Sequence, residues 1–213
     1  MMASLVARAI NFFVYLVTGV RARWLGCGPA ATQRVYFANR ASHGDFVLVW
    51  SVLPAILRLR TRPVAGADYW NRSALRRFIG AQVFHAVLID RDPQSRTADP
   101  VAMMEAALAG GDSLIIFPEG TRNTGEAPLL PLKSGLFHLA SRRPDIEYVP
   151  VWIENIGRVL PKGMLLPVPL LCSVSFGTPI TLAAGETRDQ FLTRARTAML
   201  SMRPHSASEA TPT

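Results

Sequence analysis

Apolar residues occur along this chain in short continuous runs and in longer segments that carry one apolar face. The runs predict strands at residues 35–37, 62–66, 86–89, 113–117, 148–153 and 170–177. The longer segments predict helices at residues 45–57, 68–79, 97–109, 134–141 and 187–202. Because strands and helices alternate, we expect a single-domain α/β sandwich with a largely parallel or mixed central sheet flanked by helices.

The N-terminal segment at residues 5–20 is almost wholly apolar, with Arg8 and Asn11 as its interruptions. It is shorter than the roughly 20 residues that a bilayer-crossing helix needs. A signal peptide is not expected, because Arg21 and Arg23 stand where its cleavage site would be. Two interpretations stay open: a helix that lies in one leaflet of a membrane, and a first helix that packs on the domain.

The predicted organisation has three parts. Residues 1–24 form an apolar, membrane-associating helix, residues 25–204 form the α/β domain, and residues 205–213 form a disordered tail. The net charge of +8 and the 49% share of hydrophobic residues indicate anionic partners. Nucleic acid is not expected, because zinc-finger spacing and RNP-like aromatic motifs are absent from the sequence. A membrane surface with anionic lipid fits both properties, and the arginines crowded between residues 58 and 77 either contact it or form a solvated face.

Polar side chains follow three of the predicted strands. They are Arg40, His43 and Asp45 after residues 35–37, Asp90 and Arg91 after residues 86–89, and Glu119, Thr121 and Arg122 after residues 113–117. In sheets of this kind, functional residues gather beyond the carboxyl ends of the strands. Together these side chains supply a base, a carboxylate to orient it and cationic groups for a phosphate. The sequence contains no GxSxG, GxGxxG or P-loop motif and no metal-ligand spacing, so serine hydrolysis, nucleotide use and a metal site are not expected.

Four stretches follow one another in an order typical of one enzyme family. Residues 39–45 (NRASHGD) and 117–122 (FPEGTR) are polar blocks. Residues 87–91 (VLIDR) form an apolar strand that ends in a basic residue, and residues 149–151 (VPV) form an apolar strand that contains proline. The chain resembles the glycerolipid acyltransferase superfamily, of the 1-acylglycerol-3-phosphate acyltransferase type. The FPEGTR block matches that family letter for letter.

This resemblance implies an enzyme that moves a fatty acyl chain from a thioester donor to the free hydroxyl of a lysophospholipid. The acceptor would be 1-acylglycerol-3-phosphate or a related lyso-lipid, in phospholipid synthesis. Acyl-CoA or acyl carrier protein would be the co-substrate, and neither a bound cofactor nor a metal is implied. The protein would associate with the cytoplasmic face of the cell membrane.

The resemblance also assigns substrate-binding roles. The residues concerned are Arg40, Arg91, Glu119, Gly120, Thr121 and Arg122. Among them, Arg122 would hold the phosphate as a bidentate fork. Arg91 would contact the phosphate or the donor, or would form a salt bridge with Asp90 or Glu119.

The chain departs from the family pattern at the catalytic base. The family's histidine directly after Asn39 is Arg40 here, and an arginine stays protonated at any working pH. His43 lies in the same loop and is the candidate catalytic base, with Asp45 holding its imidazole in the required tautomer. Two alternatives stay open: a lipid-binding relative without turnover, and an interaction protein that uses only its amphipathic N-terminal segment.

Three further side chains carry weaker signals. Lys133 either faces the mouth of the same site or is a solvated loop residue. His138 is expected to pack within its apolar helix, whereas His85 precedes a strand and is a second candidate to approach the site.

Overall fold

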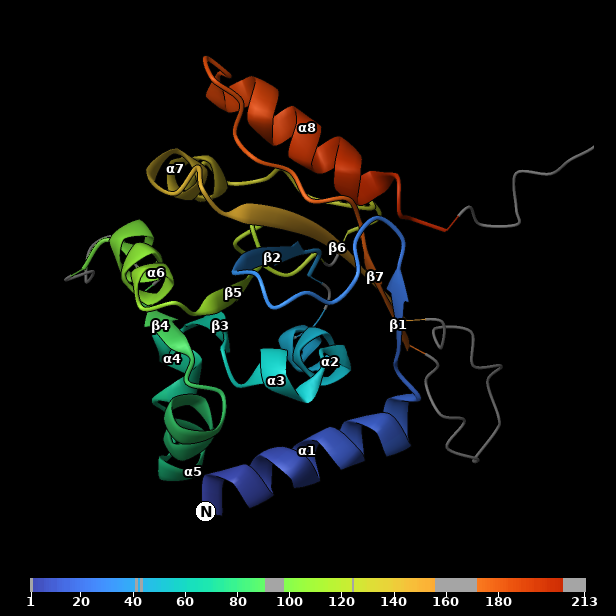
Figure 1. Cartoon of the computed structure of the whole chain (residues 1–213). Helices are drawn as coiled ribbons and strands as arrows, with labels where there is room; N and C mark the ends of the chain where they lie inside the picture. The colour runs from blue at the N-terminus through green and yellow to red at the C-terminus, as the bar shows by residue number, and fades with distance from the viewer. Residues whose placement is uncertain are drawn as a thin grey trace, which may run out of the picture.

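The computed structural model describes residues 2–40, 42, 44–90, 98–123, 125–155 and 172–204. Figure 1 shows one sheet in the middle of the molecule, with helices on both of its faces. The N-terminal helix α1 (Met2–Thr18) lies along one side of the molecule, beneath the helices that follow the second strand. The predicted α/β class and the predicted apolar N-terminal helix are confirmed.

Seven strands form the sheet, in the order β1-β7-β6-β2-β5-β3-β4. Neighbouring strands pair in parallel except β6 and β7, which pair antiparallel, so the sheet is mixed. The bounds are β1 Arg21–Trp24, β2 Arg34–Ala38, β3 Thr61–Gly66, β4 Val87–Ile89, β5 Ser113–Ile116, β6 Glu147–Asn155 and β7 Cys172–Phe176.

Strand β2 lies between two hydrophobic cores. Val35 and Phe37 belong to one core, whereas Tyr36 and Ala38 belong to the other. A strand that is buried on both faces needs a continuous apolar run, which is the pattern of residues 35–38. The first core packs against α6 (Pro100–Ala109), α7 (Gly135–Arg142) and α8 (Arg188–Leu200), and the second packs against α1 and α2 (Asp45–Val52).

The helix predicted at residues 45–57 is divided in two. Helix α2 ends at Val52, and α3 (Ala55–Arg58) begins after Pro54. Leu53 takes an extended conformation with ψ 143°, because a following proline disfavours helical geometry. The prediction of one continuous helix was therefore wrong at the proline.

The helix predicted at residues 68–79 is also divided. It consists of α4 (Ala67–Trp70), α5 (Ala74–Phe78) and the π-helical turn η1 (Ile79–Val83). Ser73 starts α5 as its N-cap, since its hydroxyl accepts the N–H of Arg76 at 3.3 Å. A serine that bonds the backbone in this way begins a new helix rather than continuing the previous one.

Two further boundaries differ from the prediction. Helix α6 begins at Pro100, with Asp99 as its N-cap, rather than at residue 97. Strand β1 was not predicted. It pairs with β7, and Trp24 stacks on Phe176 with ring centroids 4.1 Å apart, so Trp24 is used within the protein.

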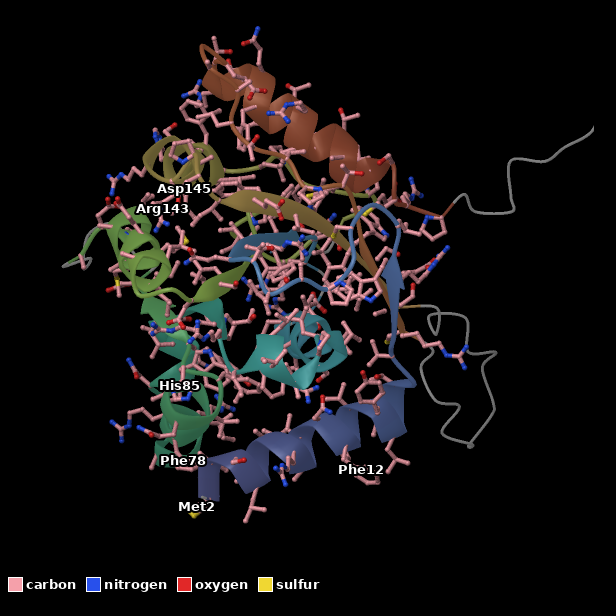
Figure 2. All side chains as sticks on the ribbon, in the orientation of Figure 1. Met2, Phe12, Phe78, His85, Arg143 and Asp145 are labelled. Atoms are coloured by element: carbon pink, nitrogen blue, oxygen red, sulfur yellow. The ribbon has the colours of Figure 1, made fainter. Side chains whose placement is uncertain are left out.

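Helix α1 packs on the domain through one narrow side. Ala7, Ile10 and Val14 contact the second core, and the Tyr15 hydroxyl donates to the carbonyl oxygen of Ser51 at 3.3 Å. Its other side is exposed, and Figure 2 shows Phe12 on the side of α1 that faces away from the domain. Within the described residues, no helix has both the length and the hydrophobicity needed to span a membrane.

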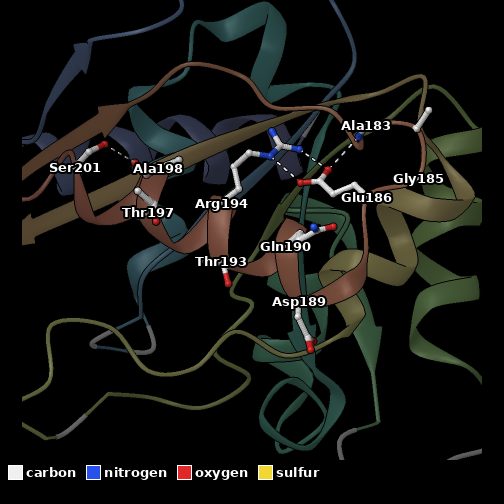
Figure 3. A pocket seen from close by; sticks show the side chains of 11 residues that line it. Ala183, Gly185, Glu186, Asp189, Gln190, Thr193, Arg194, Thr197, Ala198 and Ser201 are labelled. Carbon is white, nitrogen blue, oxygen red and sulfur yellow. Dashed lines mark hydrogen bonds and ion pairs between the residues drawn. The ribbon is translucent and has the colours of Figure 1, made fainter.

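Helix α8 closes the first core and begins with a capping box. Thr187 accepts the N–H of Gln190, while the Gln190 side chain accepts the N–H of Thr187, so the first turn of the helix is capped. A broad, open hollow of about 1050 Å³ lies along the exposed side of this helix. Figure 3 shows side chains that line it, among them the ion pair of Arg194 and Glu186. None of the described residues that were predicted for the site lines this hollow.

Candidate functional site

A cavity of about 490 Å³ opens at the carboxyl ends of β2, β3, β4 and β5. This is the edge of the sheet at which the sequence predicted the site. Its apolar lining includes Val64, Ile89, Met104, Ile116 and Leu136. Its polar lining includes Arg40, Asp90, Asp99, Lys133 and His138. The cavity therefore combines apolar residues with a polar lining in which two cations, Arg40 and Lys133, lie together with two acids, Asp90 and Asp99.

Asn39 fixes the end of β2 at this edge. Its side-chain amide donates to the carbonyl oxygen of Ile153 at 3.1 Å, and its amide oxygen accepts the N–H of Ile153 at 2.7 Å. These two bonds extend the pairing of β2 with β6 beyond its last register pair, Ala38 with Val151. The chain leaves the sheet directly after them, which places Arg40 at the cavity.

Arg40 is held on both its backbone and its side chain. Its N–H donates to Glu119 Oε1 at 2.7 Å, and its carbonyl oxygen accepts the N–H of Asn123 at 2.9 Å. Its guanidinium lies over the Phe117 ring, 5.4 Å from the centroid, a cation–π geometry. The position that the family pattern gives to a base thus carries a permanent positive charge at the cavity.

Glu119 is buried, with 1% of its surface exposed. Its Oε2 accepts the N–H of Leu130 at 2.8 Å, so its carboxylate joins the loop after β2 to two parts of the loop after β5. Burial raises the pKa of this carboxyl, and the N–H groups of Leu130 and Arg40 oppose that effect. These contacts give Glu119 a positioning role at the site.

The remaining residues of the FPEGTR block point in different directions. Gly120 lines the cavity and has a φ of +72°, a left-handed conformation that glycine adopts without strain. Thr121 and Arg122 follow on the exposed loop, and neither is among the described residues that line the cavity. The predicted phosphate fork Arg122 therefore lies in solvent beside the cavity.

Asp45 is buried at the first position of α2, directly after the N-cap Gly44. Its carboxylate turns back toward the loop, because it accepts the backbone N–H of Ser42 at 2.7 Å and the Ser42 hydroxyl at 2.5 Å. Ser42 also lines a small hollow of about 20 Å³ that shares Arg40 and Phe117 with the main cavity. The loop that contains the predicted base thus reaches the same site.

The predicted base His43 and the predicted cationic contact Arg91 both lie outside the described residues. Their described neighbours do reach the site, since Ser42 bonds Asp45 and Asp90 lines the cavity. The roles of His43 and Arg91 stay predictions.

Two histidines lie where the sequence did not place them. His138 was expected to pack inside its helix, but α7 buries Leu136 and Leu139 and exposes His138 at the cavity. Its position relative to these leucines, at helical spacing, was the available signal. His85 lies in another hollow with Arg62 and Asp112, at the amino ends of β3 and β5, and so does not approach the site (Figure 2).

For Lys133 the sequence allowed two positions, at the mouth of the site or in solvent. The structure places it in the lining of the cavity.

The fold and the site together define the class of the protein. It is an α/β protein with a cavity of mixed apolar and polar lining at the carboxyl edge of its sheet.

The chain belongs to the acyltransferase family, because the model of that family, described as Acyltransferase, matches residues 28–154. This range includes the described residues of both polar blocks, at residues 39–45 and 117–122. The resemblance found in the sequence is confirmed.

Two curated relatives carry the name 1-acyl-sn-glycerol-3-phosphate acyltransferase. The protein from Cocos nucifera is 26% identical over 175 residues, which are 77% of this chain and 54% of the relative. The protein from Limnanthes alba is 26% identical over 187 residues, which are 84% of this chain and 61% of the relative. The chain thus matches little more than half of the length of these relatives.

A solved structure has the same fold. It is the 1-acyl-sn-glycerophosphate (LPA) acyltransferase PlsC from Thermotoga maritima, with a TM-score of 0.63 and 17% sequence identity. The match covers 93% of this chain and 79% of that chain. At this identity, the likeness supports the mixed α/β fold.

Proposed function

We propose that this chain transfers a fatty acyl chain from a thioester donor to the free hydroxyl of 1-acylglycerol-3-phosphate. The observation that carries this proposal is the cavity at the carboxyl ends of β2 to β5, which combines apolar residues with the cations Arg40 and Lys133, in a member of the acyltransferase family. The names of the curated relatives support the same acceptor. Acyl-CoA or acyl carrier protein supplies the acyl group.

His43 acts as the general base in this proposal. It takes the proton from the acceptor hydroxyl, whose oxygen attacks the thioester carbonyl carbon. A C–O bond forms, the C–S bond breaks, and the sulfur leaves as a thiolate that receives the proton from the imidazolium. Asp45 orients the imidazole, and its bonds to Ser42 hold the carboxylate at the start of α2 for that task.

Cationic side chains bind the anionic parts of the two substrates. Arg40 lines the cavity directly, whereas Arg122 is exposed beside it and reaches a phosphate at the mouth. Arg91 follows Asp90, which lines the cavity, and is a third contact. Glu119 and Gly120 shape the site, and Thr121 stands next to the phosphate fork.

A second candidate function is the binding of anionic lipid without turnover. The observation that favours it is Arg40, which places a guanidinium over Phe117 at the position of the family's base. Such a cation strengthens the binding of a phosphate but does not accept a proton. The two functions differ in turnover, not in lipid affinity.

We also propose that the protein works on the cytoplasmic face of the cell membrane, where it meets anionic lipid. The exposed side of α1 supports this role, because it presents Leu5, Phe12, Phe13 and Leu16 to solvent. Of the arginines between residues 58 and 77, Arg60, Arg72 and Arg77 are exposed and available to lipid headgroups. Arg58 and Arg62 instead bond other parts of the protein. An acceptor that resides in a bilayer requires such a surface.

The test is an assay of acyl transfer with purified protein in detergent. Labelled acyl-CoA and labelled acyl carrier protein are supplied in turn, with either lysophosphatidate or monoacylglycerol of the same chain length as the acceptor. The proposal expects labelled diacyl product from lysophosphatidate and much less from monoacylglycerol. Absence of product with either donor, in protein that still binds lysophosphatidate, would favour the binding function instead.

A further inference from the structure

Lys133 is fixed to the FPEGTR block by its backbone. Its N–H donates to the carbonyl oxygen of Pro118 at 2.8 Å, so the segment before α7 is tied to the segment after β5. Its side chain is exposed and lines the cavity together with Arg40. The structure therefore brings a second cation to the cavity, from a different loop.

Gly120 gives the Lys133 side chain its path along the cavity wall. A Cβ atom at position 120 would lie 3.3 Å from Cγ and 3.4 Å from Cε of Lys133. The first distance is tighter than ordinary van der Waals contact and the second lies at its lower limit, so the aliphatic stem of Lys133 runs over the space that the missing side chain leaves. Gly120 thus has two reasons to be glycine: its positive φ and the stem that lies against it.

The Lys133 ammonium is available to a ligand. Among the described residues, no carboxylate lies within 4.0 Å of it as a salt-bridge partner. Asp99, an acid on the same rim, is already paired with Arg142 at 3.1 Å. A flexible stem with a compact positive charge suits a phosphate oxygen, which accepts a charge-assisted hydrogen bond.

We propose that Lys133 binds a phosphate group of a substrate in the cavity and that Gly120 positions it, a role that rests on the proposed function. Two substrates carry such a group. The acceptor 1-acylglycerol-3-phosphate carries a phosphomonoester, and a CoA donor carries several phosphates. The shared chemistry is a phosphate that lies between Lys133 and Arg40.

The first test measures binding without turnover. The chain has two lysines, Lys133 and Lys162, so reductive methylation followed by peptide mass spectrometry reports on Lys133 separately. Protein is labelled alone, with lysophosphatidate, with CoA, and with monoacylglycerol of the same chain length. Slower labelling of Lys133 with lysophosphatidate alone assigns the acceptor phosphate, and slower labelling with CoA alone assigns the donor. Equal labelling in all four samples would overturn the role of Lys133, even if the protein proved to be an active acyltransferase.

The second test uses kinetics. Lys133→Gln should raise the KM of the phosphate-bearing substrate that protects Lys133 by about ten- to hundredfold, as expected for one charge-assisted hydrogen bond, and should change kcat less. Arg188→Gln removes one positive charge from the start of α8 and is the matched control. An unchanged KM in Lys133→Gln would contradict the proposal.

Gly120→Ala tests the positioning role. It should raise the same KM as Lys133→Gln, and the double variant should show no further increase, because both changes remove one interaction. Gly125→Ala is the control in the same loop, where a Cβ atom would meet nothing closer than 3.8 Å. Additive effects in the double variant would show that Gly120 acts independently of Lys133.

Discussion

Glu119 is the side chain that joins the loops of the site. Its two carboxylate oxygens accept the N–H groups of Arg40 and Leu130, which lie far from each other in the sequence. A buried carboxylate with two such bonds specifies one arrangement of both loops. The geometry around Arg40 thus depends on a residue that does not line the cavity.

Glu119→Gln should therefore lower the free energy of unfolding by about 1–3 kcal/mol, because the amide NH₂ would face one of the two N–H donors. Urea denaturation followed by fluorescence measures this change. Glu126→Gln, on the exposed loop, is the control and should leave the stability unchanged. Equal stabilities of the two variants would contradict the bridging role of Glu119.

Glu186 provides a prediction about pH. Arg194 donates to both of its oxygens, at 2.9 and 2.6 Å, and holds the pKa of the Glu186 carboxyl below its usual range. Because the pKa is lower in the folded chain than in the unfolded chain, the stabilisation is present above the unfolded pKa of about 4.3 and is lost as pH falls through the folded pKa.

Glu186→Gln should accordingly be less stable than the wild type at neutral pH, and the difference should shrink as the pH falls below about 4. Denaturant titrations across this range measure the difference. If the difference in unfolding free energy between the wild type and Glu186→Gln stayed constant with pH, the effect of the ion pair would be contradicted.

At this scale the sequence predicted which loops meet at the cavity, but not how each side chain faces. The FPEGTR letters do not reveal that Glu119 points into the protein while Arg122 points into solvent. That division follows from the positive φ of Gly120 between them and from the N–H groups that surround the carboxylate. The position of Lys133 depends on its contacts with Pro118 and Gly120. These contacts join separate segments of the chain, so no local sequence pattern predicts them.

Helix α1 exposes large apolar side chains that do not pack against the rest of the protein. Its inner side contacts the second core through small and medium apolar residues, whereas Phe12 and Phe13 are 70% and 63% exposed. An apolar side chain of this size gains about 1.5–3 kcal/mol when it leaves water completely. Insertion of both rings into a lipid surface would therefore dominate the affinity.

Replacing Phe12 and Phe13 together by serine should weaken binding to anionic phospholipid vesicles at least about tenfold, since much of that transfer energy is lost. The free energy of unfolding should stay nearly constant, because neither ring is buried. Vesicle co-sedimentation measures the affinity, with Leu25→Ser, an exposed apolar residue beyond β1, as the control. Unchanged binding would exclude the outer side of α1 as the membrane contact.

At the scale of elements, prediction succeeded where apolar runs were long. It was wrong at residues 45–57 and 68–79, because Pro54 and Ser73 set boundaries that the apolar spacing conceals. Strand β1 was not predicted, because two of its four residues are arginines and the segment therefore lacks an apolar run. Its partner β7 lies at the other end of the chain, and that pairing, not local preference, makes it a strand.

The whole molecule is a mixed sheet whose β6, β2, β5, β3 and β4 strands run parallel. That architecture was predictable, since the alternation of strands and helices favours it, and it also placed the candidate site at the carboxyl edge of the sheet, where the cavity lies. The antiparallel β7 and the strand order were not predictable, because they depend on pairings between distant segments.

The net charge of +8 leads to a prediction for the molecule as a whole. Binding to anionic vesicles should weaken as the salt concentration rises, because salt screens the attraction between exposed arginines and lipid headgroups. A residual affinity at high salt should remain from the apolar side of α1. Co-sedimentation over a salt series checks this, and an affinity that is independent of salt would contradict the electrostatic contribution.

The most direct measurement is acyl transfer to lysophosphatidate by the wild type, His43→Ala and Arg40→His, run side by side. We predict that the wild type forms product and that His43→Ala loses at least about 99% of the rate, as expected for removal of a general base. Equal rates in the wild type and His43→Ala would contradict His43 as the base. An inactive wild type that Arg40→His activates would identify a lipid-binding relative and refute the enzymatic function.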